Sequence, residues 1–185
     1  ITYGDWSSDV CSSDLQVFMV SGGAFDEYWG LSFNCDQTQL VIGGTRLVGL
    51  FSPTGDGKIY NINMANGSVI NSVTVAKNIP SFVFNDINEV RSICYSPNGN
   101  YYFHTLDTVG CLTTAFNINW RLLTSYSFAY GSPNYGFTPQ PQHVIKATSN
   151  YIYTMNGATL FRRDIATGAV INSRSEEHTS ELQSP

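Results

Sequence analysis

The stretch GKIYNINMANGSVINS, from Gly57 to Ser72, is matched 101 residues later by ATLFRRDIATGAVINS, from Ala158 to Ser173. In both copies, segments rich in β-branched and aromatic residues lie on either side of a Gly. Such residues favour strands. Each copy is therefore predicted to form a β-hairpin, with its turn at Asn66-Gly67 or Thr167-Gly168. The Asn-Gly pair is typical of a two-residue type I′ turn, in which both central residues have positive φ.

The spacing of 101 residues between the two copies is too long for one four-stranded unit but suits two. A third copy of the hairpin is therefore expected between them. CLTTAFNINWRLLTSYSF, from Cys111 to Phe128, lies at that place. We align its Asn117-Ile118 with Asn63-Met64, which puts the turn at Asn119-Trp120-Arg121, where there is no Gly. This middle copy is therefore predicted to be degenerate.

A second kind of hairpin is expected before each of these copies. GLSFNCDQTQLVIGGT, from Gly30 to Thr45, aligns with SICYSPNGNYYFHTLD, from Ser92 to Asp107, so that Leu40 matches Tyr102. A version with a shorter turn, at Ser149-Asn150, precedes the last copy. Two hairpins thus repeat three times at about 50 residues, a period typical of β-propeller blades. Because one such sheet cannot bury both of its faces, neighbouring sheets are expected to stack around an axis.

Two motifs resemble known propeller repeats. SPNGNYYF, from Ser96 to Phe103, resembles the Ser-Pro-Asp-Gly turn and strand of WD-repeat-like and YVTN-type propellers. The hairpins around Gly67 and Gly168 resemble an element shared by YVTN-type and quinoprotein-like repeats. The Gly-His and Trp-Asp pairs of strict WD repeats are absent from the sequence.

This resemblance implies an all-β fold, an incomplete β-propeller with about three four-stranded antiparallel blades. The blades are expected at roughly residues 26–75, 88–128 and 140–173. Because propellers typically have four to eight blades, further blades are expected outside this sequence. The outer faces of the stack are then unpaired, which predicts poor solubility.

The two ends of the chain have no hydrophobic period. One DNA sequence that encodes Arg174 to Ser184 has a reverse complement that encodes Asp5 to Leu15, residue for residue. This DNA sequence also resembles a sequencing-library adapter. We therefore interpret residues 1–15 and 174–185 as adapter-derived flanks, and residues 16–173 as the propeller fragment.

The net charge of −5 belongs to these flanks, which hold six of the 14 acidic residues but only one of the nine basic residues. The interior has no basic stripe that would suit nucleic acid. No apolar run approaches the roughly 20 residues of a membrane-spanning helix. Neither nucleic-acid binding nor a membrane span is expected. The few charges and the abundance of Asn, Ser, Thr, Tyr and Gly favour an extracytoplasmic protein.

Cysteine spacing predicts neither a metal site nor a disulfide framework in the interior. Cys35, Cys94 and Cys111 form no CxxC or Cys/His pattern, so all three are expected to be small buried hydrophobic residues. We accordingly assign no metal-ligating or cofactor-binding residue and expect no cofactor.

Two groups of residues would suit acid–base chemistry. Asp26-Glu27 and Asp36 offer carboxylates near a turn, and the alternative is a solvated loop. His104 with Asp107 offers a base and its orienting group, but residues three apart on a strand point to opposite faces. Both groups are more simply structural, and we assign no catalytic residue. Of Arg162-Arg163, one is expected to face solvent and the other to pair with a carboxylate across a blade interface.

FAYGSPNYGFTPQPQ, from Phe128 to Gln142, has four aromatic rings and three prolines in 15 residues. It would form a stiff stacking surface for a ligand, or else a connector between blades. The candidate ligand residues are Tyr130, Tyr135, Phe137 and Trp29. The predicted function is a non-catalytic scaffold or binding module for protein or carbohydrate. The alternative is part of a propeller enzyme, a quinoprotein-like oxidoreductase or a hydrolase, with catalytic residues outside this sequence.

Overall fold

The computed structural model describes residues 27–47, 55–76, 90–105, 108–124, 143–156 and 159–175. Every regular element in these ranges is a β-strand, and none of them contains a helix able to cross a membrane. The strands are β1 (Glu27–Phe33), β2 (Gln39–Leu47), β3 (Gly55–Asn63), β4 (Val69–Ala76), β5 (Ser92–Tyr95), β6 (Tyr101–His104), β7 (Thr108–Leu112), β8 (Ile118–Leu123), β9 (His143–Ala147), β10 (Tyr151–Asn156), β11 (Thr159–Asp164) and β12 (Val170–Ser175).

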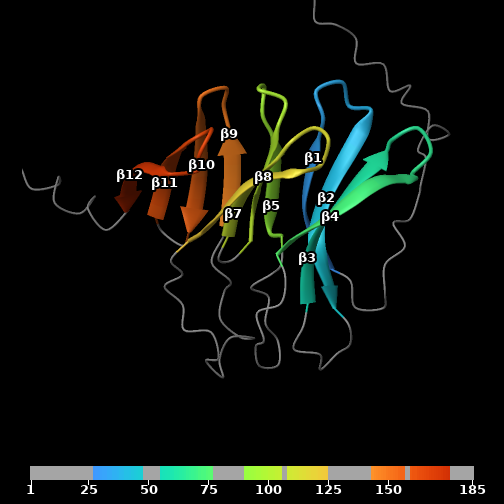
Figure 1. Cartoon of the computed structure of the whole chain (residues 1–185), viewed down its shortest axis with the longest axis horizontal. Coiled ribbons are helices and arrows are strands. Elements are labelled where there is room, and N and C mark those ends of the chain that lie inside the picture. The colour runs from blue at the N-terminus through green and yellow to red at the C-terminus, as the bar shows by residue number, and fades with distance from the viewer. Residues whose placement is uncertain are drawn as a thin grey trace, which may run out of the picture.

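The strands form three separate four-stranded antiparallel sheets, which lie side by side (Figure 1). Blade 1 has the order β1-β2-β3-β4, blade 2 the order β5-β6-β7-β8 and blade 3 the order β9-β10-β11-β12. The turns β1–β2, β5–β6 and β9–β10 gather at one end of the stack, the upper end in Figure 1. The prediction of an all-β chain with three such sheets is confirmed.

The middle blade is packed on both of its faces. Tyr101 and Phe103 on β6 belong to the hydrophobic cluster shared with blade 1, whereas Tyr102 between them belongs to the cluster shared with blade 3. All three side chains are at most 2% exposed. Successive residues on a strand point to opposite faces, so this run of aromatic residues fills two interfaces at once.

The inner strands of adjacent blades are joined directly by serine side chains. Ser32 Oγ on β1 accepts a hydrogen bond of 2.9 Å from the Tyr95 N–H on β5, and Ser92 Oγ accepts one of 3.2 Å from the Ile145 N–H on β9. The approach is close, because a Cβ on Gly30 would lie 3.0 Å from the Ser92 Cα. The first strand of each blade is therefore the innermost one.

The repeated hairpins have their glycines where predicted but a different turn type. Gly67 and Gly168 have φ of 70° and 72°, and their N–H groups donate to the Asn63 and Asp164 carbonyls at 2.8 and 2.9 Å. Each bond spans four residues, and Asn66 is not in the positive-φ region. The prediction of a two-residue type I′ turn was wrong, because one left-handed glycine closes a longer turn.

The predicted register of the middle hairpin was also wrong. Leu112 pairs with Ile118, so the turn spans residues 113–117 and Asn119-Trp120-Arg121 lies inside β8. Phe116, with φ of 63°, takes the place that glycine has in the other two copies. Glycine is favoured at this position but not obligatory. Because the middle copy has no glycine there, the sequence pattern placed its turn too late in the chain.

The first hairpins were misaligned by one residue. Phe33 pairs with Leu40 and Tyr95 pairs with Tyr101, so Leu40 corresponds to Tyr101 and not to Tyr102. The two turns differ in length by one residue, and a shift of one residue moves a side chain to the opposite face of its sheet.

Apolar side chains cover the outward faces of blades 1 and 3. Leu31 and Phe33 on β1 are 61% and 43% exposed, because Ser32 between them points toward blade 2. On blade 3, Leu160 and Tyr151 are 42% and 37% exposed. Among the described sheets, none packs against these two faces, as the repeat pattern predicts.

Candidate functional site

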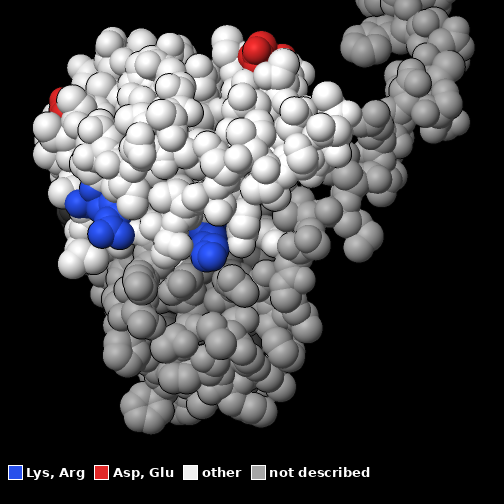
Figure 2. Space-filling model, turned by 45° about the vertical axis from the view of Figure 1, so that its right-hand side comes forward, with Lys and Arg blue, Asp and Glu red and all other residues white. Residues whose placement is uncertain are grey.

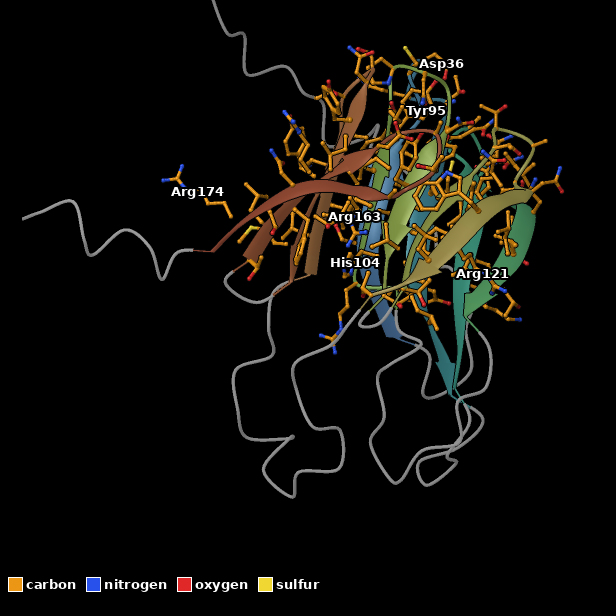
Figure 3. All side chains as sticks on the ribbon, turned by 60° about the vertical axis from the view of Figure 1, so that its left-hand side comes forward. Asp36, Tyr95, His104, Arg121, Arg163 and Arg174 are labelled. Atoms are coloured by element: carbon orange, nitrogen blue, oxygen red, sulfur yellow. The ribbon has the colours of Figure 1, made fainter. Side chains whose placement is uncertain are left out.

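A pocket of about 280 Å³ opens between blades 1 and 2 at the turn end of the stack. Figure 3 shows Asp36 and Tyr95, which both line it, at this end of the molecule. Its volume is near the lower limit of about 300 Å³ for small-molecule sites, so it would hold one small group. The lining residues are Asn34, Cys35, Asp36, Gln39, Tyr95, Tyr101 and Thr114.

The β1–β2 turn that forms one wall is held by its own hydrogen bonds. Asn34 Nδ2 donates to Thr38 Oγ1 at 3.1 Å, and Asn34 Oδ1 accepts from the Gln39 N–H at 2.9 Å. The Met64 N–H donates to the Thr38 carbonyl at 2.9 Å, which ties this turn to the neighbouring β3–β4 turn. The polar wall is therefore fixed before any ligand arrives.

Asp36 is the charged group of the pocket. Its Oδ1 accepts hydrogen bonds from Thr38 Oγ1 at 2.7 Å and from the Thr38 N–H at 3.3 Å. These bonds, that of the Thr38 side chain first, lower the pKa of this exposed carboxyl below its usual value. Asp36 is therefore ionised at neutral pH.

Gln39 offers the pocket a hydrogen-bond donor. Its Oε1 accepts a bond of 2.9 Å from Asn61 Nδ2, and Asn61 is only 3% exposed. Because the amide oxygen is engaged in this way, the amide nitrogen is the group that Gln39 can offer to a ligand.

Three aromatic rings form the opposite wall and its support. The Tyr95 and Tyr101 centroids are 5.1 Å apart, and those of Tyr101 and Phe116 are 5.8 Å apart, both edge to face. Tyr101 is 2% exposed. Burial, and then the nearby Tyr95 and Asp36, raise the pKa of Tyr101 to about 12. The phenol is therefore neutral at physiological pH.

Two turn residues next to the pocket lining have positive φ. Within the described ranges, Gln37 and Phe116 are the only non-glycine residues with positive φ, at 59° and 63°. Gln37 lies in the turn that carries Asp36, and Phe116 supports Tyr101. Each such conformation costs about 1–3 kcal/mol and persists only where the surrounding structure enforces it.

The predicted acid–base groups are not assembled in the described residues. Glu27 begins β1 and Asp36 lies beyond its other end, about 20 Å away at the usual rise of a strand. His104 is fully buried and does not line the pocket. Asp26 and Asp107 lie outside the described residues.

The predicted ligand residues Tyr130, Tyr135 and Phe137 lie outside the described residues. Trp29 is in β1, and its side chain is likewise outside what the structure describes. Sequence reasoning missed Gln39, Tyr95, Tyr101 and Thr114. The signal available for the tyrosines was their position, since one precedes and the other follows the Ser-Pro-Asn-Gly turn.

The arginine pair separates as predicted, but its partners differ. Arg162 lies 5.0 Å from the centroid of the Tyr151 ring on the outward face. Arg163 is 5% exposed and donates from Nε to Thr154 Oγ1 at 3.0 Å and from a terminal nitrogen to the Gly168 carbonyl at 3.1 Å. The predicted carboxylate partner was wrong, because a hydroxyl and a carbonyl receive these hydrogen bonds.

Cys94 and Cys111 are buried as predicted, but Cys35 is exposed in the pocket wall. Burial raises the pKa of the Cys94 thiol to about 12. Very little of the Cys94 thiol is therefore deprotonated at pH 8, and the thiolate is the form that reacts. We expect iodoacetamide to alkylate Cys35 in the folded chain at least a hundred times faster than Cys94 or Cys111, as measured by peptide mass spectrometry. Equal rates in the native state would contradict this placement, and the urea-unfolded chain is the control.

The three radial antiparallel sheets define the class of protein: the chain folds as part of a β-propeller. No protein-family model and no curated protein matches the sequence. Among solved structures, the chain is similar to BamB from Moraxella catarrhalis, with a TM-score of 0.52 and 13% identity over 79% of this chain and 37% of that one.

Two further structures show the same likeness. A protein of unknown function from Bacteroides caccae gives a TM-score of 0.55 and 10% identity over 85% of this chain and 49% of that one. The WD40 domain of Neurospora crassa Pan2 gives a TM-score of 0.54 and 12% identity over 89% of this chain and 44% of that one. The chain thus spans less than half the length of each of the three structures. At these identities the likeness establishes the fold alone.

Proposed function

We propose that this chain is a non-catalytic binding module of a β-propeller protein, with the pocket between blades 1 and 2 as its ligand site. The observation that carries the proposal is that blades 1 and 2 together form this pocket, with Asp36 and Gln39 on one wall and Tyr95 and Tyr101 on the other. The hydrogen bonds that Asn34 makes with Thr38 and Gln39 fix the polar wall, so the site is preorganised. A preorganised site loses less conformational entropy when a ligand binds.

The chemistry of the pocket favours binding over catalysis. Its described lining offers a carboxylate, two phenols, amides, a hydroxyl and a thiol. Nucleophilic catalysis by the Cys35 thiol would require an adjacent base, and the described lining contains no His, Lys or Arg. The same groups are well suited to hydrogen-bond a polar ligand.

A protein or a carbohydrate is the proposed ligand, and an extracytoplasmic location is proposed from the composition. Figure 2 shows few acidic or basic side chains, far apart, on the described surface that faces the viewer. A surface with so few charges is unsuited to a polyanion such as nucleic acid, which is held mainly through basic side chains.

Replacing Gln39 by Ala tests the site. We expect the ligand that binds best on peptide and glycan arrays to bind about three- to tenfold more weakly to Gln39→Ala, because one hydrogen bond is lost. Isothermal titration calorimetry measures the affinity, and Asn172→Ala, on the exposed strand β12, is the control. If Gln39→Ala and Tyr101→Phe both bind as tightly as the unchanged chain, the ligand site lies elsewhere.

A further inference from the structure

Three of the side chains that line the small space of this pocket carry oxygen atoms that can accept a hydrogen bond from a cation. Asp36 supplies a carboxylate, while Tyr95 and Tyr101 supply phenol oxygens. Asp36 belongs to blade 1 and both tyrosines belong to blade 2, so only the packed pair of blades forms the arrangement. We propose that this space receives the ammonium group of a lysine side chain presented by a protein partner. This inference rests on the proposed binding function and specifies its ligand.

The charge of Asp36 is the first reason. Hydrogen bonds from Thr38 favour the ionised form of this carboxyl. No cation of the described chain contributes to this effect. The described lining contributes no Lys, Arg or His that would neutralise it. A cationic ligand gains from this unpaired charge, whereas a neutral sugar gains only hydrogen bonds.

The number of oxygen groups is the second reason. An ammonium group has three N–H donors and no acceptor, and the pocket lining includes the Asp36 carboxylate and two phenols, besides the Thr114 hydroxyl and two amides. Both phenols can accept a hydrogen bond through their lone pairs. Arginine presents a planar fork of five donors, which is better matched by a pair of carboxylates than by this arrangement.

The amide nitrogen of Gln39 is the third reason, because a donor at this place favours a ligand with a backbone carbonyl, such as a peptide. Asn61 engages the Gln39 oxygen, so the amide nitrogen is left as a donor beside the ammonium site. A backbone carbonyl next to the bound lysine would accept this hydrogen bond. The volume of about 280 Å³ suits one side chain of a larger partner.

The test is a nuclear magnetic resonance titration of the full chain at low salt with the peptide acetyl-Gly-Lys-Gly-amide. We expect shifts in the amide signals of residues 35–39 and 95–101, at least tenfold weaker binding of the same peptide with an acetylated lysine, and weaker binding at high salt. The arginine analogue and methyl α-glucoside are the competing probes.

Two matched carboxylates make the experiment specific. Asp36→Asn should weaken binding of the lysine peptide about five- to tenfold. Asp164→Asn should leave it unchanged, although Asp164 also accepts bonds from a threonine, Thr167, and also has a lowered pKa. Asp164 is the last residue of β11, next to the β11–β12 turn, and does not line the pocket.

The possible outcomes distinguish an error about the ligand from an error about the binding site. Equal binding of the acetylated peptide, stronger binding of the arginine analogue, or binding of the glucoside in place of the lysine peptide would overturn the lysine inference and leave a ligand site here. If no probe moves the signals of the pocket residues and no array ligand depends on Gln39, both proposals are wrong.

Discussion

Gly110→Ala should destabilise the folded chain by about 1–3 kcal/mol, although it adds only one methyl group. Gly110 on β7 pairs with Phe103 on β6, and a Cβ at this position would lie 2.2 Å from the Cζ of that ring. Phe103 is fully buried in the cluster between blades 1 and 2, so its ring cannot move without disturbing its neighbours. Urea unfolding measures the loss as a lower transition midpoint.

A double-mutant cycle tests the cause. We expect Phe103→Leu alone to cost about 1–2 kcal/mol, because the smaller side chain leaves part of the ring volume empty. When both changes are made, the new methyl group occupies part of that space, so the combined cost should be about 1 kcal/mol below the sum of the single costs. Additive costs would mean that the ring does not cover Gly110.

Arg163→Ala is the second large effect, with an expected loss of about 2–4 kcal/mol. The change removes a buried side chain and leaves the Thr154 hydroxyl, on a residue that is 1% exposed, without its donor. The pairing pattern places Ile62 and Leu112 at the corresponding positions of blades 1 and 2. An apolar residue is therefore the usual occupant of this position.

Replacing the polar pair together should restore stability. The double variant Thr154→Val/Arg163→Leu should fall within about 1 kcal/mol of the unchanged chain or exceed it, because a buried cation and its partner are removed together. Arg162→Leu, on the outward face, is the control. Thermal and urea unfolding compare the variants, and a double variant no more stable than Arg163→Ala would show that the guanidinium itself stabilises the interface.

Turn residues explain where sequence reasoning about single hairpins succeeded and where it failed. Gly67 and Gly168 mark their turns because a left-handed residue is needed there and glycine adopts that conformation at no steric cost. Phe116 adopts the same conformation without being glycine, so the pattern gave no signal for it. Its ring packs on Tyr101, and that contact forms only in the folded blade.

The pocket could not be predicted from the sequence, for a different reason. Asp36 was noted as a carboxylate near a turn, but Tyr95 and Tyr101 looked like ordinary strand residues. They meet Asp36 because blade 2 stacks on blade 1, and the distance along the chain between them is about 60 residues. The exposure of Cys35 was missed in the same way.

The sequence by itself determined the strands, the hairpins and their threefold repetition, because alternation of side chains and turn residues are local properties of a chain. The tertiary structure alone decided the register of two hairpins, the partners of Arg163 and the composition of the pocket. These features depend on which faces meet when the sheets stack, and the length of each turn sets the register that decides which side chains occupy each face.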